Sequence, residues 1–179
     1  MRSVGLLVLG IALANCGAGK KPADRDNRTA SRISLSSSAF KDGQPIPTEY
    51  SCDGANRAPE LRWGNPPEGT KSFALVIDDP DAPGGTFRHW GVFDIPATAR
   101  SIIGGQKPGT EATNDKDSVG YTGPCPPPGH GLHHYHFKLF AVGVEKLGLP
   151  NGAKVAEVEN AAAKRTIGRG ELIGTYERR

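Results

Sequence analysis

Residues 73–83 have the sequence FALVIDDPDAP, an apolar run that ends in aspartates set among prolines. The apolar run predicts a buried strand over residues 72–78, and Pro80 ends it because proline has no N–H to donate to a strand ladder. The Asp-Pro pairs that follow are typical of turns, in which carboxylates accept bonds from nearby backbone N–H groups. The segment therefore places carboxylates at a strand end, where functional side chains are often found.

Within this turn we expect Asp79 to face a pocket and orient a histidine, and Asp81 to hold the turn. Ordinary turn chemistry for both aspartates is the alternative. Two further strands are predicted over residues 88–95 and 134–142, and both carry histidines near one end. Alternation of side chains places His89, Gly91, Phe93 and Ile95 on one face of the first. It places His133, Tyr135, Phe137, Leu139 and Ala141 on one face of the second.

These acids, imidazoles and the phenol of Tyr135 allow two interpretations. Histidine and tyrosine donors suit a small anion such as a phosphate or carboxylate. The same groups suit a hydrolytic site in which a His–Asp pair activates water. No nucleophile elbow, phosphate-binding loop or zinc-protease motif is present in the sequence. A histidine that is only a satisfied core residue is the third interpretation.

A metal or cofactor site is not expected. His130, His133, His134 and His136 are close in sequence, but His134 and His136 lie on the strand face opposite His133, and no third-ligand motif accompanies them. The run Pro126-Pro127-Pro128 is interpreted as a stiff pocket wall, with a polyproline ligand segment as the alternative.

The composition favours a mainly β fold. The chain has 179 residues, with 24 Gly and 15 Pro, which indicates many turns in one domain. Few helical segments separate the strands, so an antiparallel β-sandwich is expected. One helix is predicted near the C-terminus, over residues 153–164, with Asn151 as N-cap and Gly168 as stop, followed by a last strand over 171–177. The net charge of +3 is dispersed, so no nucleic-acid partner is expected.

The N-terminus predicts export. An apolar run follows Arg2 and is too short to span a bilayer as a permanent helix. It ends in Leu13-Ala14-Asn15-Cys16, which resembles the lipobox of bacterial lipoproteins, although Asn15 stands where Gly, Ala or Ser is usual. We therefore expect a lipoprotein-type signal peptide over residues 1–15, lipidation of Cys16, a flexible tether over 16–31 and a folded domain over 32–179. The location would be the bacterial cell envelope, on the periplasmic side or the cell surface; plain secretion and an unprocessed chain are the alternatives.

Cysteine usage agrees with export. Of three cysteines, lipidation uses Cys16 and leaves Cys52 and Cys125 as a pair. An oxidising compartment permits a disulfide between them, and two buried free thiols are the alternative.

Several ordered motifs resemble the phosphatidylethanolamine-binding protein family, also called the Raf kinase inhibitor-like proteins, and its bacterial branch in particular. They are Asp79-Pro80-Asp81-Ala82-Pro83, His89, Cys52-Asp53-Gly54, Leu61-x-Trp63, Gly123-Pro124-Cys125-Pro126-Pro127, His133-x-Tyr135 and Leu172-x-Gly174-Thr175-Tyr176. The resemblance covers residue 33 to the end. One departure is His134, which stands where many members have arginine.

The resemblance implies an antiparallel β-sandwich with a few short peripheral helices and a small anion pocket at one end. Phosphate, phosphoethanolamine and acetate are the ligands it implies. The implied ligand-binding residues are Asp79, His89, Gly123, Pro124, His133 and Tyr135, with Asp81, Trp90 and Tyr121 as supporting residues. It also implies no general enzymatic activity, and inhibition or scaffolding of a kinase or protease as the action on partners.

The sequence thus predicts a membrane-tethered binding module for a small phosphate-bearing or acidic ligand, with an envelope kinase or protease as the implied protein partner. The alternatives are a weak hydrolase that uses a His/Asp-activated water, and a structural envelope lipoprotein that binds nothing.

Overall fold

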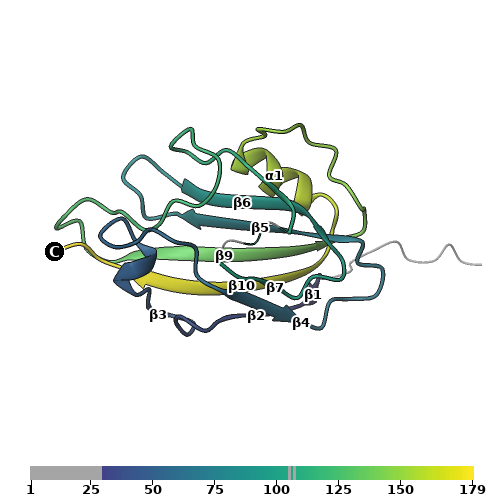
Figure 1. Cartoon of the computed structure of the whole chain (residues 1–179), viewed down its shortest axis with the longest axis horizontal. Coiled ribbons are helices and arrows are strands. Elements are labelled where there is room, and N and C mark those ends of the chain that lie inside the picture. Colours follow the sequence, from purple (N-terminus) through teal and green to yellow (C-terminus); the bar gives the residue numbers. More distant parts are fainter. Residues whose placement is uncertain (1–29, 105, 107) are drawn as a thin grey trace, which may run out of the picture.

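The computed structural model describes residues 30–104, 106 and 108–179, whose strands form two sheets (Figure 1). The larger sheet has the spatial order β1 (Ser31–Arg32), β10 (Thr166–Tyr176), β9 (His133–Val142), β5 (Ser72–Asp79), β6 (Phe87–Pro96) and β8 (Thr110–Glu111), and β3 (Gln44–Pro45) also pairs with β10. The smaller sheet has the order β2 (Ser34–Ser37), β4 (Leu61–Gly64) and β7 (Ser101–Ile102). A 3₁₀ turn, η1 (Thr48–Tyr50), and one α-helix, α1 (Val155–Ala163), complete the described elements. The mainly β prediction is confirmed.

The antiparallel prediction holds for the long strands and needs one correction. Strands β10, β9, β5, β6 and β8 pair antiparallel in that order. The short segments β1 and β3, however, run parallel to β10, one near each end of the edge that β9 leaves free. The larger sheet is therefore mixed, because the chain passes along this edge of β10 twice in the same direction.

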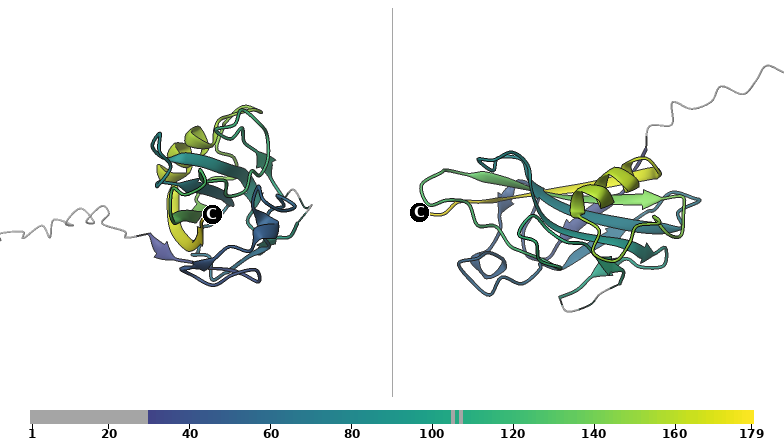
Figure 2. Two further views of the ribbon diagram at one scale, coloured as in Figure 1. Left: turned by 90° about the vertical axis from the view of Figure 1, so that its left-hand side faces the viewer. Right: turned by 90° about the horizontal axis from the view of Figure 1, so that it is seen from above.

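Two hydrophobic clusters explain why residues 73–77 form an unbroken apolar run. Phe73, Leu75 and Ile77 face the core between the two sheets, whereas Ala74 and Val76 face a second cluster under α1. All eight residues of β5 are consequently buried. A strand covered on both faces has no solvent side that would need polar residues. Figure 2 shows these layers end-on, with α1 over one face of the larger sheet and the smaller sheet beneath the other.

Two irregularities in β6 turn Gly91 and Phe93 away from the face predicted for them. The pairing of β6 with β5 shifts register between Phe73 and Leu75, and again between Ile77 and Asp78. Phe93 therefore lies in the cluster under α1, but Ile95 lies in the core between the sheets. The expectation that His89, Gly91, Phe93 and Ile95 share one face is wrong, because each extra residue on a strand reverses the alternation.

Helix α1 is shorter than predicted. Its N-cap is Lys154, whose backbone N–H donates to the Glu157 carboxylate at 2.7 Å, and the predicted cap Asn151 lies in the preceding turn. At the other end Lys164 is the C-cap, and β10 begins at Thr166. Gly168 is thus a strand residue packed against Pro67, where a side chain would clash, and not the helix stop.

The start of the described chain and the C-terminus lie at opposite ends of the molecule. Figure 1 places β1 toward one end of the long axis and marks the C-terminus at the other. The loops that follow β5 and precede β9 lie at the C-terminal end, where the N–H of Gly129 donates to the carbonyl of Arg178 at 3.0 Å. Residues 1–29, with the predicted signal peptide, Cys16 and most of the tether, lie outside the described residues. No helix in the described part of the chain is long and apolar enough to cross a membrane.

Candidate functional site

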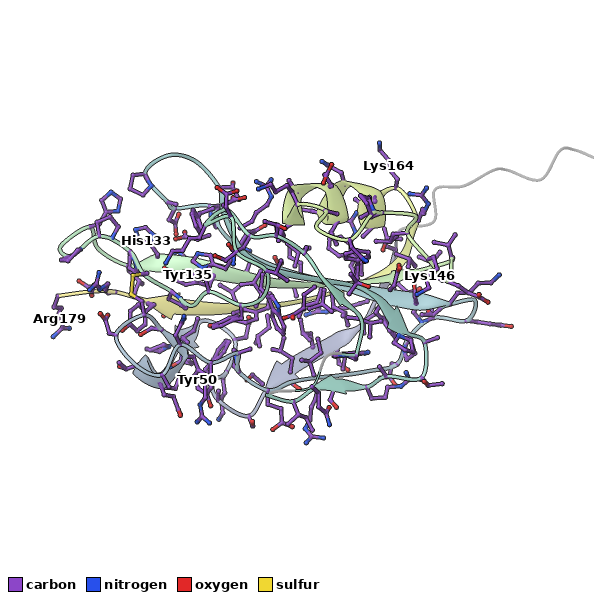
Figure 3. All side chains as sticks on the ribbon, turned by 45° about the horizontal axis from the view of Figure 1, so that its top comes forward. Tyr50, His133, Tyr135, Lys146, Lys164 and Arg179 are labelled. Carbon is purple, nitrogen blue, oxygen red and sulfur yellow. A yellow bond between two sulfur atoms is a disulfide. The ribbon has the colours of Figure 1, made fainter. Side chains whose placement is uncertain are left out.

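A cavity of about 150 Å³ opens where β5 ends and where β6 and β9 begin. Figure 3 shows His133 and Tyr135 at the same end of the molecule as the C-terminal Arg179. The cavity brings together four predicted residues, Asp79, His89, His133 and Tyr135. Its other lining residues are Ala82, Pro83, Phe87, Lys116, Cys125, Pro126 and Pro127.

Asp79 orients a histidine, as expected from the sequence. Its Oδ2 accepts a bond from His133 Nδ1 at 2.7 Å, and both side chains are buried. Its Oδ1 accepts the backbone N–H of Asp81 at 2.8 Å, which closes the turn after β5. Because a carboxylate only accepts, the proton of this bond belongs to His133 Nδ1.

The second nitrogen of His133 is also occupied. Its Nε2 lies 2.8 Å from Nδ1 of His130, an exposed residue between Gly129 and Gly131. With Nδ1 bonded to Asp79, both ring nitrogens of His133 have protein partners. The ring therefore stiffens one wall of the cavity, and it has no nitrogen left to bind a ligand unless His130 moves.

His89 enters the cavity as a neutral imidazole. Its Nδ1 lies 2.9 Å from the carbonyl oxygen of Thr122, so Nδ1 carries the proton and Nε2 is the acceptor of the ring. Burial, the main cause, lowers the pKa of His89 below its ordinary value, against the opposing effects of the Thr122 carbonyl and of Asp79. The ring stacks edge-to-face on Phe87 and Tyr135, with centroids 4.8 and 5.2 Å away.

The hydroxyl of Tyr135 is a buried group that makes no hydrogen bond of normal geometry within the described residues, although the Asp79 carboxylate and the Cys125 backbone lie near it. The side chain is 1% exposed, and its Oη makes no hydrogen bond. Burial raises the pKa of this phenol, and the negative charge of Asp79 adds to the effect, so the group stays protonated. A buried O–H without an acceptor costs about 1–3 kcal/mol, so its position in the cavity predicts an acceptor there.

Lys116 is a lining residue that sequence reasoning missed. It lies in the loop after β8, and its backbone N–H donates to Oδ1 of the buried Asn114 at 2.9 Å. The preceding residue, Asp115, anchors the loop to β6. Its Oδ2 accepts the N–H of Arg88 at 2.8 Å, and its own N–H donates to the Arg88 carbonyl at 3.0 Å. The loop sequence has no periodicity or motif that points to this contact with the start of β6.

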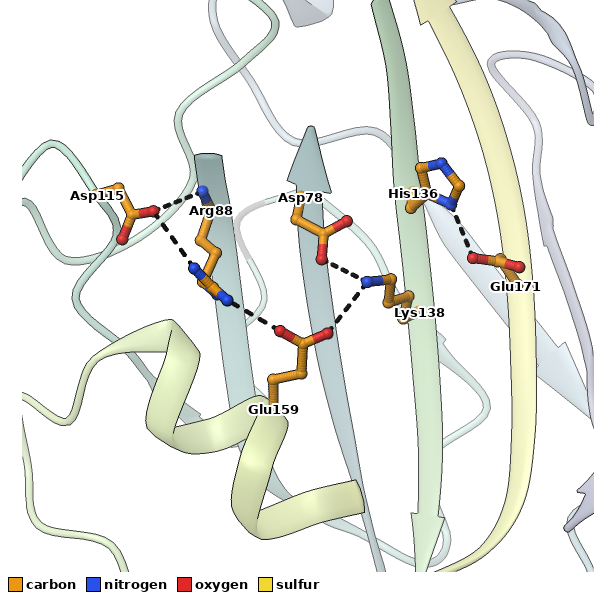
Figure 4. A network of polar contacts seen from close by, with 7 residues as sticks. All are labelled: Asp78, Arg88, Asp115, His136, Lys138, Glu159 and Glu171. Atoms are coloured by element: carbon orange, nitrogen blue, oxygen red, sulfur yellow. Dashed lines mark hydrogen bonds and ion pairs between the residues drawn. The ribbon is translucent and has the colours of Figure 1, made fainter. Parts of the chain in front are cut away.

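Asp115 also belongs to a chain of alternating charges on the opposite face of the larger sheet (Figure 4). Arg88 lies between Asp115 and Glu159, and Lys138 lies between Glu159 and Asp78. Burial raises the pKa of the Asp78 carboxyl, with Lys138 opposing it. This row of ion pairs connects α1 to β5, β6 and β9, and through Asp115 it also connects them to the loop of Lys116.

Gly123 and Pro124, predicted to form the wall of the cavity, do not line it; the residues that follow them do. The lining residues are Cys125, Pro126 and Pro127, whereas Gly123 and Pro124 tie this segment to the loop after η1. The Gly123 N–H donates to Asn56 Oδ1 at 2.7 Å, and the Pro124 carbonyl accepts the N–H of Cys52 at 3.0 Å. Cys52 and Cys125 are joined by a disulfide at the same place.

Three predicted supporting residues lie outside the cavity. Trp90 and Tyr121 contact each other edge-to-face at 5.7 Å and line a separate hollow of about 100 Å³. Asp81 does not hold the turn through its side chain. Its Oδ2 instead accepts two bonds from His134, one from the backbone N–H at 2.9 Å and one from the ring Nδ1 at 2.7 Å. Within the described residues no group of three or more His, Cys, Asp or Glu side chains is placed to hold a metal ion.

Comparisons with known proteins agree on one family. Its model, described as phosphatidylethanolamine-binding protein, matches residues 36–177. A protein of Aquifex aeolicus named UPF0098 protein is 48% identical over 151 residues, covering 79% of this chain and 86% of that protein. LppC of Mycobacterium tuberculosis, whose name proposes that it is a lipoprotein, is 40% identical over 188 residues, covering 96% of this chain and 92% of that protein.

Solved structures show the same likeness. YbcL of Escherichia coli, described as a member of the mammalian phosphatidylethanolamine-binding protein family, superposes with a TM-score of 0.78 at 34% identity, covering 82% of this chain and 99% of YbcL. CT736 of Chlamydia trachomatis superposes with a TM-score of 0.76 at 32% identity, covering 84% of this chain and all of that chain.

Proposed function

The chain belongs to the phosphatidylethanolamine-binding protein family, and on that premise we propose that it is a binding module for a small phosphate-bearing ligand. We further propose that a lipid on Cys16 tethers it to the bacterial cell envelope. The similarity to LppC over almost the whole chain supports the tether.

One observation carries the ligand proposal. Tyr135 Oη is a buried donor that makes no hydrogen bond of normal geometry within the described residues, and its cavity also contains a ring acceptor, His89 Nε2. A phosphate that carries one proton satisfies both groups at once. A charged oxygen accepts from Tyr135, and the P–OH group donates to His89.

The proton in the hydrogen bond between the ligand and His89 can come from the ligand or from solution. A fully ionised phosphate has no proton to donate, so its binding requires His89 to take up a proton from solution. Either route places one proton between a phosphate oxygen and Nε2. The size of the cavity, about 150 Å³, is below the range of about 300–1,000 Å³ for pockets of drug-sized ligands and suits a single headgroup.

The geometry favours binding over the alternative of a weak hydrolase. A water-activating histidine needs a free ring nitrogen, and both nitrogens of His133 are bonded to Asp79 and His130. The described lining has no serine or threonine, and its cysteine, Cys125, is in the disulfide. Among the described lining residues there is thus no serine, threonine or free cysteine to act as a nucleophile, and the histidine that keeps a free ring nitrogen, His89, is oriented by a backbone carbonyl and not by a carboxylate.

The test is an NMR titration of the full chain with O-phosphoethanolamine, following the ring signals of His89. His136 is the control, because it lies on the outer face of the sheet against Glu171. We expect the His89 signals to move and to return in excess inorganic phosphate, while His136 stays unchanged. Unmoved His89 signals at millimolar ligand would refute the proposed pocket.

A further inference from the structure

We propose that Lys116 makes this pocket selective for phosphomonoesters over phosphodiesters, an inference that rests on the proposed function. A phosphomonoester keeps a terminal phosphoryl group with three unsubstituted oxygens. A phosphodiester carries substituents on two sides and only one negative charge.

The first support is the depth of the cavity. Its most buried lining side chains are Asp79, His133 and Tyr135, at 3%, 1% and 1% exposure, whereas Lys116 and Pro83 are exposed. The cavity therefore has an inner end at the Asp79–His133 pair and a mouth beside Lys116. A terminal phosphoryl can enter such a pocket end-on, but a phosphate with chains on two sides must leave one of them in the inner part.

The second support is charge. Lys116 is the one lysine or arginine among the described lining residues, and its ammonium has no carboxylate partner in the described part of the chain. The carboxylate of Asp79 already accepts from His133 and from the N–H of Asp81. A compact ammonium acts on a phosphate as a point charge, so a monoester that binds as a dianion, with the proton on His89 taken from solution, makes a stronger contact than a singly charged diester.

The third support is that Lys116 is held in place. Asn114 Oδ1 accepts the N–H of Lys116, and Asn114 Nδ2 donates to the Gly120 carbonyl at 3.0 Å. Asp115 is fastened to the backbone of Arg88, the neighbour of His89. The loop thus holds the backbone of Lys116 beside the mouth, and the charge of its side chain acts on His89.

Lys116 also acts on His89, which gives a readout that needs no ligand. The groups that face His89 are Asp79 from β5, His133 and Tyr135 from β9, and Lys116 from its loop. Burial is the main cause of the lowered pKa of His89, and the positive charge of Lys116 lowers it further. Replacing Lys116 by a neutral residue should therefore raise the pKa of His89.

The experiment compares three ligands on the full chain by calorimetry: inorganic phosphate, O-phosphoethanolamine and glycerophosphoethanolamine, a diester with the same amine. The variant is Lys116→Met, and the control is Lys164→Met, at the C-cap of α1. We expect the unsubstituted protein to bind the monoester about tenfold more tightly than the diester. Lys116→Met should weaken monoester binding about tenfold, the lower end for a bond to a charged group, because the ammonium is exposed. Lys164→Met should leave it unchanged.

Equal affinities for monoester and diester in the unsubstituted protein would overturn the proposal, as would a preference that survives Lys116→Met. NMR titration of the His89 ring distinguishes a failure of the Lys116 proposal from a failure of the proposed binding function. A higher pKa of His89 in Lys116→Met together with absent binding of all three ligands to the unsubstituted protein would refute the proposed function itself. An unchanged pKa would show that Lys116 does not face the pocket.

Discussion

Tyr135→Phe removes one oxygen atom and, with it, the donor on which the proposed function depends. Because the Asp79 carboxylate and the Cys125 backbone lie near Oη without forming a hydrogen bond of normal geometry, the folded protein without ligand loses at most weak contacts in the exchange. We therefore expect its free energy of unfolding to stay equal or to rise, by up to about 1–2 kcal/mol, as the desolvation cost of a buried hydroxyl disappears. Most core substitutions destabilise a protein, so this sign is informative.

The bound state should show the opposite effect. A bond from the Tyr135 hydroxyl to a charged phosphate oxygen is worth about 1.5–3 kcal/mol, so Tyr135→Phe should weaken binding at least about tenfold. At a phosphate concentration of about 100 times the dissociation constant, binding stabilises the unsubstituted protein by about 2.7 kcal/mol. The same concentration should stabilise the variant by only about 1.4 kcal/mol.

Urea unfolding with and without phosphate measures both quantities in one series. Tyr50→Phe is the matched control, since it removes a phenolic hydroxyl outside the cavity. The reasoning would be refuted if Tyr135→Phe destabilised the ligand-free protein by more than about 1 kcal/mol while phosphate stabilised variant and unsubstituted protein equally. That result would mean the hydroxyl has a partner within the protein.

Three further predictions follow from the geometry. Because the pKa of folded His89 is lowered, the unfolded chain takes up the proton first, so the ligand-free protein should lose stability as the pH falls below about 6.5; His89→Gln should flatten this slope in urea unfolding, and a slope of unchanged size would contradict the assignment. Gly123→Ala should cost about 2–4 kcal/mol, because a Cβ there would lie 2.1 Å from a backbone carbonyl oxygen, whereas Gly84→Ala meets nothing within 4 Å and should cost under about 1 kcal/mol in the same measurement; equal costs would be inconsistent with the close approach. Reduction of the Cys52–Cys125 bridge, which spans 73 residues, should lower stability by roughly 4 kcal/mol in the chain-entropy model; thiol labelling of the unfolded, unreduced chain at either cysteine would disprove the bridge.

The sequence predicted those parts of the site that depend on strand alternation. Five apolar residues followed by Asp78 and Asp79 located the end of β5, and the period of two placed His133 and Tyr135 on one buried face of β9. Turn chemistry at Asp79 needed only neighbouring residues, so it too was predictable.

What the sequence did not predict depends on irregular pairing and on contacts between distant loops. The register shifts in β6 turn Gly91 and Phe93 to the face opposite Ile95, and nothing in a single sequence marks where a strand gains a residue. Lys116 reaches the cavity because Asp115 bonds to the backbone of Arg88, 27 residues away. His130 blocks His133 through a loop whose path is set by Gly129 and its bond to Arg178.

Strand β1 and the pocket lie at opposite ends of the molecule, so the end at which the domain is anchored decides where the pocket faces. A lipid at Cys16 would hold the end of the domain where β1 lies, and the cavity opens at the end that carries the C-terminus. A domain standing on its anchor would then present the pocket outward, away from the bilayer that holds it. Such a pocket samples solutes or surfaces across the surrounding aqueous space before it meets the headgroups beneath it. In that orientation the protein would be a receptor that faces the compartment, with its anchor as a base.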